Sequence, residues 1–208
     1  MWELFLGEIK RNISPTKEFI EKQLSFLLKK GLCSEEKYNA IVAVRYMAAY
    51  EQAVNEYLHP PLDFKQANIK AELIHFGSIF EGSFEIFLVS LHKNKSITAE
   101  NYNVWFPNNK VVEFVIHEEK LSKKQKNKQI RSLQFKAMID CLSKWNWHAN
   151  DANEEIHDFI RLADMLRIER NNVHISHMVS TSIFHEEYKL VEVREQWEKF
   201  IEVIKHKI

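Results

Sequence analysis

The chain has 208 residues, of which only four are Gly and four are Pro, about a third of average usage. This scarcity excludes all-β sandwiches and barrels, which need turn residues about every 8–12 positions, and dinucleotide-binding folds, which need glycines between strand and helix. The 29 basic and 29 acidic side chains cancel, so the chain as a whole does not attract nucleic acid. Any nucleic-acid partner must be bound by a local basic patch.

Cysteine usage and the lack of targeting signals predict a soluble, cytoplasmic protein that makes no contact with a membrane. Cys33 and Cys141 are far apart and form no CxxC motif, so we expect reduced thiols. Residues 1–8 place acidic residues among apolar ones and have neither a basic region nor a small-residue cleavage site. The longest uncharged runs, such as residues 86–91, fall far short of the ~20 residues that a membrane span needs.

Three helices are predicted in the first half of the chain. Pro15 and Gly31 frame a helix over about 15–30, and Ser34 begins a second helix that ends at 58, before His59-Pro60-Pro61. Asp63 is predicted to cap a third helix that continues to about 91. This third helix is apolar around much of its circumference, so we expect it to be central.

Gly77 and Gly82 interrupt this apolar helix. Glycine inside a helix costs stability, so each needs a reason such as the close approach of another backbone. A tight helix crossing is the favoured reason, and a ligand site is the alternative.

Residues 93–128 are predicted to be an irregular insertion. The segment 102–116 has turn residues in its middle and β-branched residues in its second half, which is compatible with a short β-hairpin or with a loop. A basic run follows and is either a solvated segment or a rim that binds phosphate backbone. Its members are Lys120, Lys123, Lys124, Lys126, Lys128 and Arg131.

Three more helices are predicted over about 129–146, 151–176 and 185–206, the second of them opened by a capping box at Asp151 and Glu154. The fold class is therefore all-α, a bundle of about five to six helices. We expect one domain over residues 1–208, with residues 1–33 as an additional N-terminal helical segment.

The helix over 151–176 carries the most informative pattern. Its apolar stripe continues at helical spacing into a polar strip on the same face. The strip consists of Arg167, Arg170, His174 and His177. Because buried charges need partners, the strip should face a cleft, a subunit interface or an acidic neighbour.

Three interpretations of this strip compete. The helix end is simply solvated, or His174 and His177 bind a metal ion, or the strip is a metal-free acid–base site for a phosphodiester. The metal site is disfavoured because Arg167 and Arg170 would repel the ion, and no HExxH motif or Cys ligand accompanies the histidines. In the third interpretation, Arg holds phosphate oxygens and His moves protons near neutral pH, while the 2′-hydroxyl of RNA supplies the nucleophile.

The segment 166–175, Leu-Arg-Ile-Glu-Arg-Asn-Asn-Val-His-Ile, resembles the signature helix of the HEPN superfamily, in which an Arg, commonly followed by Asn, precedes a His by four to six residues. The apolar stretch 80–85 is similar to an earlier helix of HEPN-like proteins. The resemblance implies a HEPN-like helical bundle over about 35–206. Arg170 takes the place of the motif arginine and Asn171 that of its polar neighbour. His174 follows Arg170 after three residues and His177 after six, so either is a candidate for the motif histidine.

Many members of this superfamily are metal-independent endoribonucleases of toxin, abortive-infection or antiviral systems, in which two motifs meet across a homodimer and leave a 2′,3′-cyclic phosphate. The resemblance therefore implies a ribonuclease with no cofactor, with Arg170, Asn171 and either His174 or His177 as catalytic residues. Arg167 and the basic run would bind RNA, and an antitoxin is an implied protein partner. The alternative is a non-catalytic HEPN-like module for binding or dimerisation.

Overall fold

The computed structural model describes residues 7, 11, 13–108, 134–148, 154–171 and 187–207. Within these residues the chain is helical and has no strand, which confirms the all-α prediction. The described helices are α2 (Lys17–Lys29), α3 (Glu35–Leu58), α4 (Leu62–Lys93), α5 (Ala99–Trp105), α7 (Phe135–His148), α8 (Glu154–Asn171) and α10 (Glu187–Lys207).

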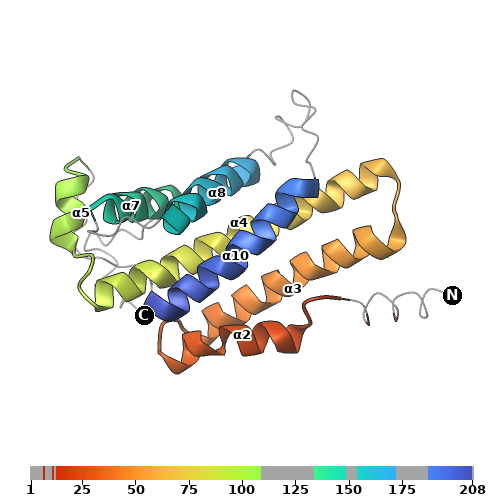
Figure 1. Cartoon of the computed structure of the whole chain (residues 1–208), viewed down its shortest axis with the longest axis horizontal. Helices are drawn as coiled ribbons and strands as arrows, with labels where there is room; N and C mark the ends of the chain where they lie inside the picture. The colour runs from red at the N-terminus through yellow and green to blue at the C-terminus, as the bar shows by residue number, and fades with distance from the viewer. Residues whose placement is uncertain are drawn as a thin grey trace, which may run out of the picture.

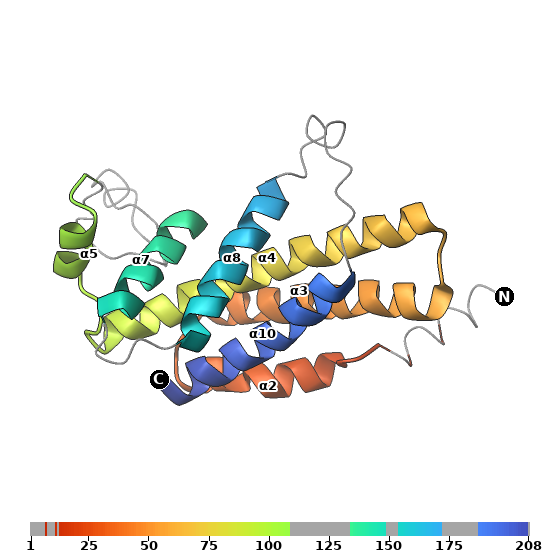
Figure 2. The ribbon, with the colours of Figure 1, turned by 45° about the horizontal axis from the view of Figure 1, so that its top comes forward.

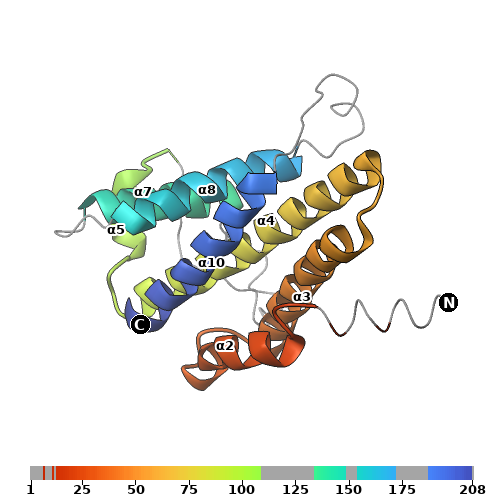
Figure 3. The same ribbon diagram turned by 45° about the vertical axis from the view of Figure 1, so that its right-hand side comes forward.

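Helix α4 is central, as its apolar composition predicts, and it contacts α3, α7, α8 and α10. Helices α3 and α4 run antiparallel and lie side by side (Figure 1). Helix α10 lies between α2 and α8 (Figure 2). Helices α7 and α8 lie on one side of α4, and α2 and α3 lie on the other side (Figure 3).

Local side-chain and backbone contacts fix the beginning of α3 and the end of α2. The Ser34 hydroxyl accepts a hydrogen bond from the Lys37 amide at 3.2 Å, which satisfies an amide that the first helical turn leaves unpaired. Gly31 follows the end of α2 with a φ of 61°, a left-handed conformation that glycine adopts without strain. Both signals confirm the predicted boundary between the first two helices.

The predicted starts of α2 and α4 need correction. Thr16 is the N-cap of α2, since its side chain accepts from the Phe19 amide at 3.2 Å, so Pro15 lies before the helix and not at its first position. Helix α4 begins at Leu62, directly after Pro61, so Asp63 lies inside the first turn and is not the cap. There its carboxylate stabilises the positive end of the helix dipole.

The first arm of the predicted hairpin is helical instead. Helix α5 places residues 102–105 in a helix, while residues 109–116 lie outside the described part of the chain. A reciprocal capping box begins this helix: Thr98 Oγ1 accepts from the Asn101 amide at 3.2 Å, and Asn101 Oδ1 accepts from the Thr98 amide at 3.1 Å. Asn in place of the usual Glu or Gln concealed this start signal.

The last three predicted helices are present within the described residues. Helix α7 covers the second part of the range predicted as 129–146, α8 lies inside 151–176, and α10 matches 185–206 closely. Residues 129–133, 151–153 and 172–186 lie outside the described part of the chain.

One aromatic cluster fills the centre of the bundle and joins α4, α8 and α10. The Phe200 ring on α10 lies 5.0 Å from the rings of both Phe84 and Phe159, measured between centroids, and 5.8 Å from that of Phe87. All four side chains are buried. The predicted apolar stripes of α8 and α10 meet here and are buried as expected.

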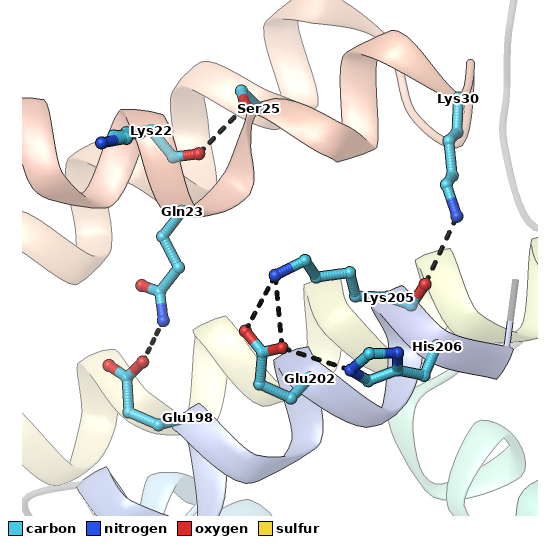
Figure 4. A network of polar contacts seen from close by, with 8 residues as sticks. All are labelled: Lys22, Gln23, Ser25, Lys30, Glu198, Glu202, Lys205 and His206. Carbon is cyan, nitrogen blue, oxygen red and sulfur yellow. Dashed lines mark hydrogen bonds and ion pairs between the residues drawn. The ribbon is translucent and has the colours of Figure 1, made fainter.

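Helix α2, within the segment predicted as an additional N-terminal piece, shares the main core. Its buried side chains are Ile20, Leu24 and Leu27. Polar contacts tie it to α10 (Figure 4): the Gln23 amide donates to Glu198, and Lys30 Nζ donates to the Lys205 carbonyl oxygen at 3.3 Å. These contacts link segments 175 residues apart.

Helix α4 is long and apolar enough, by composition, to cross a membrane. Its most apolar window has a mean hydropathy of 1.3, but 67% of that window is buried inside the protein. A core helix has this character because neighbouring helices, rather than lipid, cover its apolar surface.

The two glycines of α4 lie at close helix contacts, as predicted. A Cβ atom at Gly77 would lie 3.4 Å from the Leu166 carbonyl oxygen on α8, so the backbones of α4 and α8 cross there. A Cβ atom at Gly82 would lie 3.2 Å from Cδ1 of Ile41 on α3. The first contact is with rigid backbone, whereas the second is with the end of a side chain that can rotate.

We therefore expect Gly77 to tolerate Ala but not a larger residue. A methyl group at Gly77 makes ordinary van der Waals contact, so Gly77→Ala should stabilise the protein by up to about 1 kcal/mol through helix propensity. Gly77→Leu should destabilise it by about 1–3 kcal/mol, because the added atoms meet the α8 backbone. Urea unfolding of both variants tests this pair. Equal stability of the Ala and Leu variants would contradict a tight crossing at Gly77.

Candidate functional site

The polar strip predicted on α8 begins at the crossing with α4. Leu166 is fully buried, and Arg167 and Arg170 follow it on the edge of the buried face. Because α4 has no side chain at Gly77, α8 approaches closely, and Cδ of Arg170 lies 3.8 Å from the position a Gly77 Cβ would take. The arginine stem thus covers the crossing, while its charged end reaches the edge of the bundle.

Arg170 forms an ion pair with Glu81 of α4 through its Nη1 atom and Glu81 Oε2. Glu81 lies one helical turn after Gly77, so both residues are on the face of α4 that contacts α8. Gly77 allows the close approach of α8, and Glu81 binds Arg170 of that helix. The side chains of Arg170 and Glu81 are 36% and 31% exposed. The site is therefore open to solvent on one side, and a ligand can approach both groups.

Arg167 has a different acidic partner from Arg170. Its Nε donates to Asp164 on the same helix at 2.8 Å, and Lys136 of α7 lies 3.6 Å from the same carboxylate oxygen. Of the three surroundings predicted for the strip, the structure shows acidic neighbours for both arginines. Arg170 is bound across two helices, whereas Arg167 is bound mainly within α8.

Most of the other predicted site residues lie outside the part of the chain that the structure describes, and Asn171 is the exception. Asn171 is the last residue of α8. Beyond the described residues lie His174, His177, Lys123, Lys124, Lys126, Lys128 and Arg131.

A cavity of about 350 Å³ lies beside Glu81, between α3 and α7 and over the surface of α4. Glu85 lines it together with Glu81, and Lys37 of α3 forms an ion pair with Glu85. Its apolar lining includes Ile41, Val44, Ile79 and Met138. Its volume lies within the range of small-ligand sites, and its lining mixes apolar and polar side chains.

A buried charge cluster inside the bundle was missed by the sequence analysis. Glu72 of α4 is fully buried and accepts two hydrogen bonds from Arg194 of α10, at 2.7 and 2.8 Å. Arg45 of α3 is 3% exposed, and its guanidinium carbon lies 5.3 and 5.2 Å from the ring centroids of Phe76 and Trp197. Two aromatic faces thus stabilise the buried cation.

Burial dominates the electrostatics of this cluster. It raises the pKa of Glu72 above its usual value, although the hydrogen bonds and charge of Arg194 act in the opposite direction. It likewise lowers the pKa of Arg45, against the attraction of Glu198, which lies 3.4 Å away. Helical spacing could have indicated that Arg45 is buried, because it lies four residues from both Ile41 and Ala49 and therefore on the same apolar face of α3.

The two cysteines are free thiols, as predicted. Burial raises the pKa of Cys141 to about 12, and burial also raises the pKa of the partly buried Cys33. A thiol with a raised pKa is a poor nucleophile at neutral pH. Neither cysteine therefore supplies the chemistry of a site.

The described residues contain no group of three His, Cys, Asp or Glu side chains placed to hold a metal ion. Comparison of the chain with protein-family models, with curated proteins and with solved structures gives no match. A functional conclusion therefore depends on the residues themselves, above all on Arg170, Glu81 and the cavity beside them.

Proposed function

We propose that this protein is a HEPN-like endoribonuclease that cleaves RNA without a metal ion, through attack of the 2′-hydroxyl. The observation that carries the proposal is Arg170, a partly exposed arginine fixed at a helix crossing and followed by the segment with His174 and His177. A guanidinium has five N–H donors in a planar fork. The hydrogen bond to Glu81 uses one nitrogen, Nη1, so the fork retains capacity for phosphate oxygens.

In the proposed reaction, Arg170 holds the scissile phosphate and stabilises the charge that builds on its oxygens. One histidine, His174 or His177, accepts the proton of the 2′-hydroxyl as its oxygen attacks phosphorus. The bond from phosphorus to the 5′-oxygen breaks, and that oxygen receives a proton from the general acid. The products are a 2′,3′-cyclic phosphate and a 5′-hydroxyl, and Asn171 orients the histidines.

The surroundings of this site are part of the same proposal. Lys123, Lys124, Lys126, Lys128 and Arg131, together with Arg167, attract the RNA backbone without reading its sequence. The active form is a homodimer in which two Arg170 helices face each other, in the cytoplasm. A toxin, abortive-infection or defence role is proposed, with an antitoxin as the partner that restrains it.

Incubation of the purified protein with a structured RNA in EDTA tests the chemistry. We expect cleavage that leaves cyclic-phosphate ends, and no cleavage when the same strand carries 2′-deoxyribose throughout, since the nucleophile is then missing. Fragments ending in 3′-hydroxyl groups, or activity that EDTA abolishes, would contradict the mechanism.

The second candidate is a non-catalytic HEPN-like module for binding or dimerisation. It is favoured by one observation, namely that Arg170 already has a carboxylate partner within its own chain. In that case the protein leaves RNA intact, and Arg170→Ala changes only its self-association, as measured by sedimentation. Expression in bacteria separates the two candidates, because growth arrest that Arg170→Ala relieves supports the ribonuclease.

A further inference from the structure

The cavity beside Glu81 has no role in the phosphate chemistry proposed above. It is bounded on one side by Lys37, Ala40, Ile41 and Val44 of α3, and Met138 of α7 also lines it. On α4, Glu81 lines this cavity and also binds Arg170. A ligand that occupied the cavity would therefore lie next to any phosphate held by Arg170.

The lining suits a flat molecule with apolar faces and a polar edge. Aliphatic side chains, those of Ile41, Val44 and Ile79 with the thioether of Met138, offer surface for a ring. Polar groups come from Ser78, Glu81 and Glu85, which follow one another at helical spacing on α4, and from Lys37 of α3, which pairs with Glu85. Single-stranded RNA presents this combination, because its unstacked bases have apolar faces and hydrogen-bonding edges.

The polar lining also selects among the four bases. An ionised carboxylate only accepts hydrogen bonds, so the base edge that faces it must present N–H donors. Guanine carries an N–H and an adjacent amino group on its Watson–Crick edge, and these two donors match the two oxygens of one carboxylate. Adenine and cytosine offer an amino group beside a ring acceptor, and uracil offers one N–H between two carbonyl acceptors; in each case an acceptor would repel the second oxygen.

Glu81 is the carboxylate best placed for this contact. It is 31% exposed, whereas Glu85 is 12% exposed and is bound by Lys37. A carboxylate has about four lone-pair positions. The Arg170 contact, which is made to Oε2, therefore leaves Glu81 with further acceptor capacity.

We propose that the cavity lined by Ser78, Glu81 and the aliphatic side chains of α3 and α4 binds a guanine base of RNA. This inference rests on the proposed function in that the adjacent phosphate is the one held by Arg170. It adds base selectivity to a site that the phosphate chemistry alone would leave indifferent to sequence.

Calorimetric titration with nucleoside 3′-monophosphates tests the cavity without any cleavage step. The wild-type protein should bind guanosine 3′-monophosphate at least about fivefold more tightly than the adenosine, cytidine and uridine compounds. Ala40→Trp should weaken guanosine binding by a similar factor, because Ala40 is an exposed residue at the cavity. Ala43→Trp is the matched control, since Ala43 is equally an exposed alanine of α3 but does not line the cavity.

Glu81→Gln tests whether the Glu81 carboxylate accepts the hydrogen bonds of the base, because it replaces one carboxylate oxygen with an amide NH₂ donor. The preference for guanosine should fall to within about twofold of the other nucleotides, a ratio that a merely structural loss would not alter. Equal binding of all four nucleotides by the wild-type protein, or an unchanged preference in Glu81→Gln, overturns the inference.

Failure of this inference is distinguishable from failure of the proposed function. Cleavage of a random RNA pool with no preference at guanine contradicts guanine binding in the cavity but supports the proposed ribonuclease activity. Selective guanosine binding that Ala40→Trp weakens, in a protein that cleaves no RNA, supports the pocket and overturns the ribonuclease.

Discussion

Arg170→Ala is expected to lower the rate of RNA cleavage by at least about 100-fold, the effect of removing one preorganised donor from a developing negative charge. Arg170 is suited to this role because α8 crosses α4 at Gly77 and fixes the arginine stem at the edge of the bundle. Single-turnover cleavage of a labelled RNA measures the effect. Arg170→Lys should recover little of the rate, because an ammonium group lacks the planar fork that binds two phosphate oxygens.

Arg161 provides a matched control on the same helix. It lies nine positions before Arg170 and hence on the opposite face of α8, and it also pairs with a glutamate, Glu192, at 3.2 Å. Arg161→Ala removes the same charge from α8 but should leave the cleavage rate within about twofold of wild type. Equal losses in Arg161→Ala and Arg170→Ala would show that net charge, and not a defined phosphate site, determines the activity.

Arg194→Met is expected to destabilise the fold by about 3–5 kcal/mol, the cost of leaving a buried charge without its partner. Glu72 is fully buried and accepts both of its short hydrogen bonds from Arg194. Urea unfolding at pH 7 measures the loss. Arg161→Met, which breaks an exposed ion pair with Glu192, should cost less than about 1 kcal/mol.

The double variant Glu72→Leu/Arg194→Met should recover most of the stability, since an apolar pair needs no hydrogen-bonding or charged partner when buried. A double variant as unstable as Arg194→Met would contradict this account.

Arg194→Met should also lower the free energy of unfolding less at pH 5 than at pH 7. Burial raises the pKa of Glu72 in the folded protein, so the contribution of Glu72 to stability is greatest below the usual carboxyl value of 4.5 and is lost as pH rises through the folded-state pKa. Without Arg194, which lowers that pKa, the loss should be larger and extend to higher pH.

The helices were predictable where local signals and periodicity agree. Ser34, Gly31 and the buried stripe of α10 mark helix ends and a core face that the structure confirms. The start of α4 was predicted wrongly because Pro61, and not Asp63, occupies the position before the first helical residue. Helix α5 was missed because its capping box uses Asn101 in a segment otherwise suited to a turn.

The candidate site was only partly predictable. Sequence spacing placed Arg167 and Arg170 on the core-facing side of α8 and predicted that they face a cleft, a subunit interface or an acidic neighbour. The structure shows acidic neighbours for both. It did not identify Glu81 as the partner or reveal the cavity beside it. The same limit applied to the buried pair of Glu72 and Arg194.

The sequence by itself determined the all-α class, several helix boundaries and the buried stripes of α8 and α10, because caps and helical periodicity act between residues that are close along the chain. Only the tertiary structure decided that Arg170 binds Glu81, 89 residues away, and that Arg194 binds Glu72, 122 residues away. Such pairs depend on how two helices cross, and the crossing at Gly77 is set by packing of backbones and side chains from both helices.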